Sequence, residues 1–229
     1  SDADGDGIGE PVPRWKEPVA DAPHYSIPVS DEFDGPSLSL QWQWQANPDA
    51  SFYSLSERKG YIRMRCCKNP LRENLLWYAP NALTEIPHGD EFTIDASLEL
   101  CGDKDGDFGG IGIIGHRYGY IGIYFENGSY SIRSYYGKVK EKTFAGLAEE
   151  DLVQKEIIPE GKAYLRIEVR KDRNYFLSYS LDGEDYRMID RIFTLERATW
   201  TGAKPMLWAS NRLNAESEGY ADFDYFRLS

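Results

Sequence analysis

Closely spaced tyrosines near the middle of the chain alternate with small and apolar residues. Tyr118, Tyr120 and Tyr124 fall at even spacings, so an extended strand places them on one face. Arg133 and Tyr135 share one face of the strand that follows. Flat amphipathic rings on a rigid sheet suit stacking against sugar rings, and a row of them is costly to leave exposed without a use. The spacing therefore predicts a carbohydrate-binding face that contains these five residues.

Four further side chains extend the predicted carbohydrate site. Arg166 and Glu99 are expected to join Arg133 in forming hydrogen bonds with sugar hydroxyls. Trp77 and Trp208 are additional candidates for the same site. The alternative interpretation is that another loop, another sheet or another domain covers the tyrosine row.

A calcium site is expected where the first and last strands of the domain meet. Terminal strands of closed sandwiches often lie side by side, and the two segments here, residues 31–35 and 221–227, are both acidic. A hard cation there would bind the Asp224 carboxylate and the main-chain carbonyls of Glu32 and Gly60. The alternative makes Asp224 a surface carboxylate on an edge strand. Residues 2–10 also resemble a calcium loop, but Pro13 stands where a bidentate Glu is needed, so we interpret them as a solvated linker.

Catalytic groups are not expected in this chain. A glycosidase needs two carboxylates about 5–9 Å apart across the bond that it cuts. The best strand pattern offers Asp95 and Glu99 without a leading Glu, which indicates solvated positions or hydrogen-bond partners for a ligand. The three histidines are scattered, and no nucleophile elbow occurs. We therefore expect no enzymatic activity from this chain alone.

Short antiparallel strands would have to position all of these residues. Asn127-Gly128 is the dipeptide that best tolerates the backbone angles of a tight hairpin, and Asp182-Gly183 marks a second one. Only residues 145–154 hint at a helical turn. Alternating segments separated by turn signals predict an all-β fold, an antiparallel β-sandwich or jelly roll. The clearest predicted strands are residues 61–66, 92–100, 111–114, 164–170, 174–180, 186–189, 206–209 and 220–228.

Charge and composition restrict the partners. The chain has 229 residues, a net charge of −12 and a pI near 4.8. No basic patch offsets this acidity, which argues against nucleic acid and anionic membranes as partners but is compatible with neutral polysaccharides. No apolar run approaches the roughly 20 residues that span a bilayer.

Cysteines and the first residues add two expectations. Cys66 and Cys67 are adjacent on a predicted strand and cannot both pair with Cys101, so three reduced thiols are expected, with one disulfide from Cys101 as the alternative. Residues 1–29 are rich in Pro, Asp and Gly without periodicity, which predicts an extended linker before a domain of residues 30–229. The first residues resemble a cut made inside a larger protein.

Several short motifs, in the same order along the chain, are shared with a known family. The chain resembles the C-terminal concanavalin A-like β-sandwich module attached to family 43 glycoside hydrolases of the β-xylosidase type. The motifs are Gly7-Ile-Gly-Glu10-Pro11-Val12 with Trp15-Lys-Glu-Pro18, Asp31-Glu-Phe-Asp34, Leu40-x-Trp42-x-Trp44, Gly60-Tyr-Ile-Arg-Met-Arg65, Leu76-Trp77-Tyr78-Ala-Pro80-Asn81-Ala-Leu-Thr84 and Ala221-Asp-Phe-Asp224-Tyr-Phe226.

The resemblance implies a non-catalytic accessory module of an enzyme that degrades plant cell-wall polysaccharide, xylan or arabinan. The linker would then come from an N-terminal catalytic domain, the propeller, which is the expected partner together with the polysaccharide. In some members such a module binds xylan, and it can lend a loop residue that narrows the catalytic pocket. The closing strand is similar to the calcium-bearing strand of related glycosidases, which supports Asp224 with Glu32 and Gly60. The alternative is a purely structural domain that packs on the propeller, and the compartment stays open among secreted, periplasmic and cytoplasmic.

Overall fold

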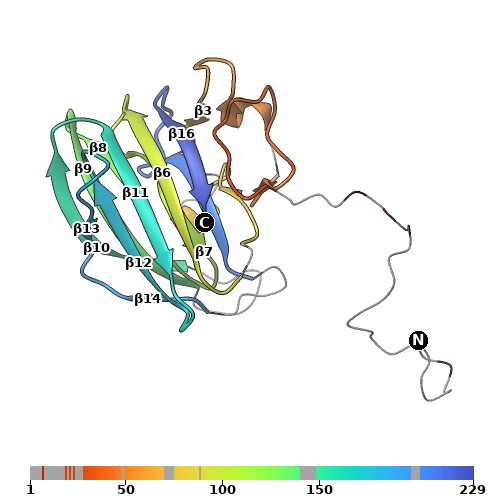
Figure 1. Ribbon diagram of the computed structural model, residues 1–229. Coiled ribbons are helices and arrows are strands. Elements are labelled where there is room, and N and C mark those ends of the chain that lie inside the picture. The colour runs from red at the N-terminus through yellow and green to blue at the C-terminus, as the bar shows by residue number, and fades with distance from the viewer. Residues whose placement is uncertain are drawn as a thin grey trace.

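Two sheets packed face to face form a β-sandwich in the computed structural model, which confirms the predicted all-β fold (Figure 1). The structure describes residues 7, 19, 21, 23, 28–47, 49–69, 75–87, 89–139, 148–196 and 202–229. One sheet, here called the tyrosine sheet, has the strand order β1-β5-β15-β7-β8-β9-β10, with β4 beside β15. The other, called the arginine sheet, has the order β13-β12-β11-β6-β16-β3-β2, with β14 beside β12. The pairing is antiparallel except between β4 and β15.

The predicted strands are present; of the eight predicted ranges, four are longer in the structure, two have the same length and two are shorter. The tyrosine sheet contains β1 (Gln43–Trp44), β4 (Cys67–Lys68), β5 (Leu83–Thr84), β7 (Asp107–Ile114), β8 (Arg117–Glu126), β9 (Ser129–Val139), β10 (Ala148–Ile158) and β15 (Lys204–Asn211). The arginine sheet contains β2 (Tyr53–Ser54), β3 (Ile62–Arg65), β6 (Phe92–Cys101), β11 (Lys162–Val169), β12 (Asn174–Ser180), β13 (Arg187–Met188), β14 (Phe193–Thr194) and β16 (Tyr220–Leu228).

The main hydrophobic core lies between the two sheets. Ile94 on β6 pairs across the ladder with Ile167 on β11, and both are fully buried. From the tyrosine sheet, Ile121 and Ile123 of β8 face the same core. Figure 1 shows β6 between β11 and β16, although these strands are far apart in the sequence. Such long-range pairing brings side chains of three distant segments onto one outer face.

The predicted hairpin between β8 and β9 is confirmed. Asn127 and Gly128 have φ values of 52° and 70°, the positive pair that a two-residue turn of this kind requires. The second predicted hairpin, through Gly183, joins β12 to β13. All three cysteines carry free thiols.

Helical structure in the described part of the chain is limited to two short turns, η1 (Ala50–Phe52) and η2 (Leu76–Tyr78). None of the described helices is long and apolar enough to cross a membrane. The predicted helical turn over residues 145–154 is wrong from residue 148 onward, because β10 pairs there with β9 as the edge strand of the tyrosine sheet. Hydrogen bonding to a free strand edge outweighs the weak local preference of an acidic run.

The predicted linker stays a prediction, because most of residues 1–27 lie outside the described residues. The same holds for the acidic residues 2–10 and for the motifs at residues 7–12 and 15–18.

Candidate functional site

The outer face of the tyrosine sheet carries the predicted aromatic row. Tyr120 on β8 lies directly opposite Tyr135 on β9, with ring centroids 5.2 Å apart and an interplanar angle of 14°. Tyr118 stacks on Tyr120 at 6.2 Å, and Trp208 from β15 meets Tyr120 edge-on at 5.1 Å. The structure thus brings the predicted aromatic residues together on one face. With Phe108, Tyr124 and neighbouring apolar side chains they form a second hydrophobic cluster, here called the tyrosine cluster.

The exposure expected for this row is wrong. Tyr118, Tyr120 and Trp208 are 0% exposed, and Tyr135 is 7% exposed. Trp77 on η2 is half-buried and packs on Tyr118 with ring centroids 5.9 Å apart. The rings therefore pack on one another, and sugar contact through them remains a prediction that would need the cluster to open.

A buried carboxylate binds the hydroxyl groups of the cluster. Glu150 reaches in from β10 with its side chain fully buried, and it accepts hydrogen bonds from the hydroxyls of Tyr118 at 2.8 Å and Tyr120 at 2.5 Å. The main-chain N–H of Leu76 donates a third, at 2.8 Å. Arg212 donates from Nη1 to Glu150 at 2.6 Å and also to the Tyr120 hydroxyl.

These contacts fix the protonation state of the two tyrosines. Burial first, and then the charge of Glu150, raise the pKa of Tyr118 and of Tyr120 well above the ordinary value. Burial alone would lower the pKa of Arg212, but Tyr120 and Glu150 together raise it. Both phenols therefore stay neutral, and their hydroxyls donate to Glu150.

Arginine side chains cover the remaining rings. The Arg133 guanidinium lies 3.5 Å from the ring centroid of Tyr124 and pairs with Glu126 at 2.7 Å. Arg212 lies 4.1 Å from the ring centroid of Tyr135. The faces on which a sugar would stack are therefore occupied by cations of the same chain.

Glycines make room for these rings. A Cβ atom at Gly137 would lie 2.1 Å from Cζ of Tyr118, and one at Gly112 would lie 2.6 Å from Cβ of Tyr120. Glycine on a strand face lets another layer approach closely. Here the chain's own aromatic rings fill the space.

Two predicted residues lie on the opposite side of the sandwich. Arg166 on β11 and Glu99 on β6 project from the outer face of the arginine sheet, where Arg166 pairs with Asp95 at 2.7 Å. Both sheets and the main core separate them from Tyr120. The prediction that they share one site with the tyrosine row is wrong, because alternation along a strand does not say to which sheet that strand belongs.

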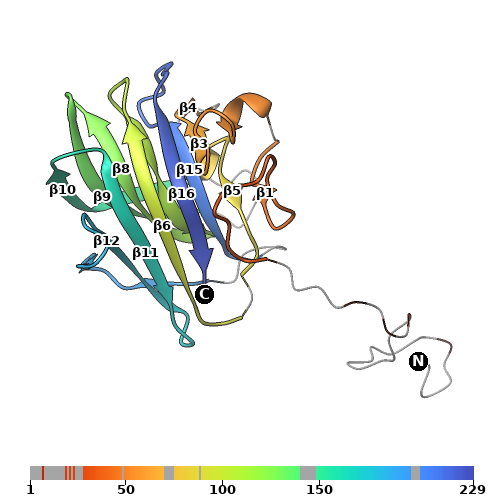
Figure 2. The ribbon, with the colours of Figure 1, turned by 45° about the horizontal axis from the view of Figure 1, so that its top comes forward.

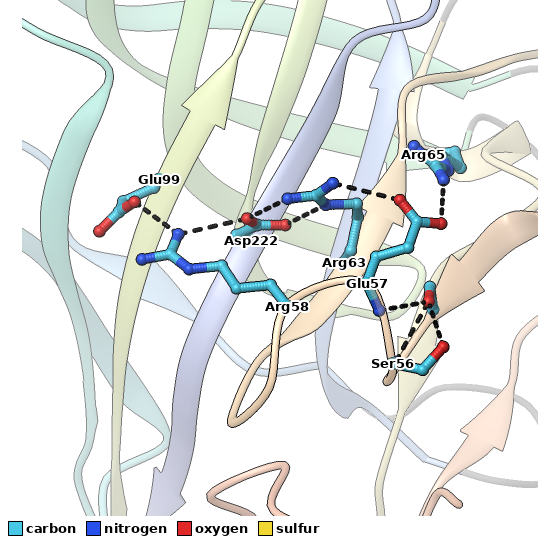
Figure 3. A network of polar contacts seen from close by, with 8 residues as sticks. Ser56, Glu57, Arg58, Arg63, Arg65, Glu99 and Asp222 are labelled. Atoms are coloured by element: carbon cyan, nitrogen blue, oxygen red, sulfur yellow. Dashed lines mark hydrogen bonds and ion pairs between the residues drawn. The ribbon is translucent and has the colours of Figure 1, made fainter. Parts of the chain in front are cut away.

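Glu99 instead belongs to an ion-pair network that the sequence reasoning missed (Figure 3). Arg58 joins Glu99 at 2.6 Å to the buried Asp222 at 3.2 Å. Arg63 binds Asp222 through two hydrogen bonds, of 2.7 and 2.8 Å, and continues to Glu57 at 3.1 Å. The hydrogen bond from Arg58 lowers the pKa of Glu99.

Arginines on this face also cover tyrosine rings. Arg58 lies over Tyr61 at 3.5 Å from its centroid, and Arg63 lies over Tyr220 at 3.6 Å. Each of these arginines is held in place by a carboxylate at the same time. Alternating charge on β3, β6 and β16 is a signal for such a network, but only the strand order shows which charges meet.

The predicted calcium region has the expected meeting of chain ends. Asp31 and Phe226 form an isolated antiparallel bridge, with N···O distances of 2.8 and 2.9 Å, which confirms that the first and last segments lie side by side. The pairing of β16 with β6 shifts register between Phe223 and Tyr225, so Asp224 has no partner in that ladder. A bulge of this kind frees main-chain groups for other ligands.

The residues around the predicted calcium ligands have contacts of their own. The Glu32 carboxylate accepts two hydrogen bonds from Arg227, of 2.7 and 2.8 Å, whereas the predicted calcium ligand is the Glu32 carbonyl. Gly60 has a φ of 76°, and an added Cβ would lie 3.4 Å from the Asp34 carboxylate. In the residues described, no group of three or more His, Cys, Asp or Glu side chains is suited to a metal. The predicted set uses one carboxylate and two carbonyls, so calcium stays a prediction.

We expect a chelator to lower the Tm of this chain if calcium binds at Asp224. At a free calcium concentration ten times Kd, binding would add about 1.4 kcal/mol to the free energy of unfolding, or roughly 3–6 °C in Tm. Thermal unfolding in EDTA, with and without added calcium, measures this shift. Asp224→Asn should abolish the response to calcium. If EDTA leaves the Tm of the wild type unchanged, the prediction of a calcium site at Asp224 is wrong.

Comparison with known proteins decides the family. Residues 30–229 match the family described as the β-xylosidase C-terminal concanavalin A-like domain. The chain belongs to this family. Residues 30–229 therefore correspond to the C-terminal domain of these proteins and not to their catalytic domain.

The similar proteins are longer than this chain. A β-xylosidase of Formosa agariphila is 28% identical over 244 residues, which cover 98% of this chain and 39% of the relative. A putative β-xylosidase of Xylanibacter ruminicola is 25% identical over 217 residues, which cover 89% of this chain and 35% of the relative. This accessory domain thus spans less than two-fifths of the curated relatives that it matches.

Solved structures show the same architecture. A bifunctional GH43-CE protein of Bacteroides eggerthii has a TM-score of 0.77 and 29% identity, over 89% of this chain and 26% of that protein. A xylan β-1,4-xylosidase of Bacillus halodurans has a TM-score of 0.74 over 98% of this chain and 44% of that protein. The second is 18% identical, so it supports the fold alone.

Proposed function

We propose that this accessory domain belongs to a family 43 glycoside hydrolase that acts on plant cell-wall polysaccharide, xylan or arabinan, and that it packs against the N-terminal catalytic domain of the same protein. The similar proteins of Formosa agariphila and Xylanibacter ruminicola, a β-xylosidase and a putative β-xylosidase, support the substrate class. The observation that carries the structural role is the closed tyrosine cluster. Its rings are buried, and Glu150 and Arg212 use the hydroxyls of Tyr118 and Tyr120.

Carbohydrate binding is the competing proposal. Through the tyrosine cluster it would require Arg212 to leave the ring of Tyr135 and Arg133 to leave that of Tyr124. Each departure would break a charged contact, with Glu150 and Glu126 respectively. A shallow sugar site gives few desolvated contacts with which to offset that cost. The proposed structural role needs no such rearrangement.

Affinity electrophoresis of this chain on several xylans and arabinans tests the choice. We expect migration to be the same with and without each polysaccharide. Retardation on any of them would support carbohydrate binding and contradict a purely structural role. In that case Tyr120→Ala together with Tyr124→Ala, and Tyr61→Ala just before β3 of the opposite sheet, would identify the binding face, with circular dichroism as the check on folding. A gel without polysaccharide is the reference, and bovine serum albumin, run in every gel, is the control for migration.

A further inference from the structure

Glu85 is a buried carboxylate without a partner. It follows β5, its side chain is almost fully buried at 1% exposure, and its main-chain N–H donates to the carbonyl of Pro205 at 3.1 Å. Neither carboxylate oxygen has a hydrogen-bond partner among the residues that the structure describes. A buried ionisable group without a partner is costly, and such groups in native proteins call for an explanation.

A second orphan acceptor lies next to it. The Nε2 of Gln41 donates to the carbonyl of Ser30 at 3.2 Å, while its Oε1 is also without a described partner. The three unsatisfied atoms, two on Glu85 and one on Gln41, are all acceptors when Glu85 is ionised. In that ionised state none of the three atoms has a described donor, and a donor from another surface would satisfy them.

The side chains of Glu85 and Gln41 line a groove with an apolar rim. Leu40 is 98% exposed and Ile86 is 51% exposed, although both are large apolar side chains. Hot spots of protein–protein interfaces lie in well-packed, desolvated pockets, where the surrounding contacts exclude water. The groove is lined by Pro28, Val29, Leu40, Gln41, Gln43, Glu85 and Ile86.

The position of the groove favours one occupant. It lies at the β1–β5 edge of the tyrosine sheet, the edge opposite β10, as Figure 2 shows. Pro28 and Val29, through which the chain enters the sandwich, form part of its lining. Any domain that precedes them is tethered beside the groove, which raises its effective concentration there. The chain also has a net charge of −12, so its electrostatic complement is a basic surface.

We propose that this groove is the docking surface for the N-terminal catalytic domain, which inserts an arginine or lysine side chain at Glu85 and covers Leu40 and Ile86 with apolar side chains. The inference rests on the proposed structural role and adds the surface and the chemistry of the partner. The inserted cation would satisfy the acceptors of Glu85 and Gln41. The rim would exclude water from this ion pair.

In the undocked domain the Glu85 carboxyl has a raised pKa. Burial, with a smaller contribution from the charge of Asp31, raises the pKa of Glu85 to about 8, although the Gln41 side chain lowers it in part. Gln41, Gln43 and Pro205 are neutral, so Asp31 is the other ionisable group that acts on Glu85 within the described residues. A folded-state pKa above the unfolded one means that the unfolded chain loses its proton first. Stability is therefore lost as pH rises from about 4.5 to about 8 and is level above that range.

Glu85→Gln therefore has opposite effects in the two contexts. In this chain alone the variant removes an unpaired buried acid, so its Tm at pH 8.5 should be higher than that of the wild type, by about 2–4 °C at the least, and equal to it at pH 4. In the full-length protein it removes the partner of the docked cation. Hydrogen–deuterium exchange should show residues 38–43 and 83–87 protected in the full-length wild type relative to this chain, at least tenfold in exchange rate.

Both Glu85→Gln and Leu40→Ser should reduce that protection in the full-length protein. Ile192→Ser is the matched control, because Ile192 is an exposed large apolar residue, at 63%, far from the groove in sequence. Protection of another surface but not of these two segments would overturn the docking surface and leave the proposed structural role intact. No protection anywhere in the domain would overturn the structural role itself. If this chain alone forms a dimer and Leu40→Ser abolishes that dimer, a second copy of the chain occupies the groove. That result would overturn the inference.

Discussion

Replacement of Glu150 by alanine is expected to lower the free energy of unfolding of this chain by about 3–5 kcal/mol. The Glu150 side chain is fully buried and accepts hydrogen bonds from Tyr118, Tyr120, Leu76 and Arg212. Its removal leaves the Arg212 guanidinium, whose side chain is 16% exposed, without its carboxylate. Breaking one side of a buried ion pair costs far more than the pair contributes, because the remaining charge is left desolvated.

Thermal unfolding should show this loss as a fall in Tm of roughly 6–20 °C, since about 2–4 °C corresponds to 1 kcal/mol at this chain length. Glu149→Ala is the matched control, because Glu149 is the preceding residue and forms an exposed pair with Lys138 at 3.7 Å. An exposed pair contributes about 0–1 kcal/mol. Replacing both partners, as in Glu150→Leu with Arg212→Met, should recover most of the loss. If Glu150→Ala is no more destabilising than Glu149→Ala, the network does not hold the cluster together.

The second large effect is expected at Gly122. This residue on β8 lies directly opposite Gly110 on β7, and an added Cβ would lie 2.1 Å from the carbonyl oxygen of Gly109 and 2.9 Å from Cα of Gly110. Both contacts are with backbone, so no side-chain rotation can relieve them. An alanine must push two central strands apart, and overpacking of this kind costs about 1–3 kcal/mol, with the upper end expected here because the contacts are with backbone.

Urea unfolding of Gly122→Ala should therefore show a midpoint well below that of the wild type. Gly35→Ala is the control, because a Cβ there makes only an ordinary contact, 3.4 Å from the carbonyl oxygen of Ser37. The two variants carry the same chemical change, so the difference between them isolates the close approach of β7 and β8. Equal midpoints would mean that the strands can separate without cost, and that the glycines are not required by packing.

Both variants perturb a layer that acts as a second core. The main core lies between the sheets, whereas the tyrosine cluster lies on the outer face of one sheet. A sandwich with apolar packing on both faces of a sheet has fewer surfaces left for ligands. This is the physical reason why the structural role at the β1–β5 edge is favoured over a sugar platform on β8 and β9.

Local sequence patterns predicted most of the strands and turns. Alternation of period two is a property of the extended backbone, so it identified β6, β8, β9, β11 and β16 without knowledge of the fold. The positive φ values of Asn127 and Gly128 follow from residue type in the same way. The prediction that the two ends of the domain meet also held, at the bridge between Asp31 and Phe226.

Everything that depends on distant segments needed the tertiary structure. Alternation shows which residues share a strand face with Tyr120. The side chains that bind the Tyr120 hydroxyl, Glu150 and Arg212, lie 30 and 92 residues away in the sequence. Arg166 and Glu99 fit the same local pattern as the tyrosines and lie on the other sheet, because long-range hydrogen bonding decides which strands are neighbours. Local patterns are therefore sufficient to predict an antiparallel sandwich with an aromatic strand pair. The burial of this pair depends on the tertiary fold, since burial is set by what packs on a face, which period-two alternation does not encode.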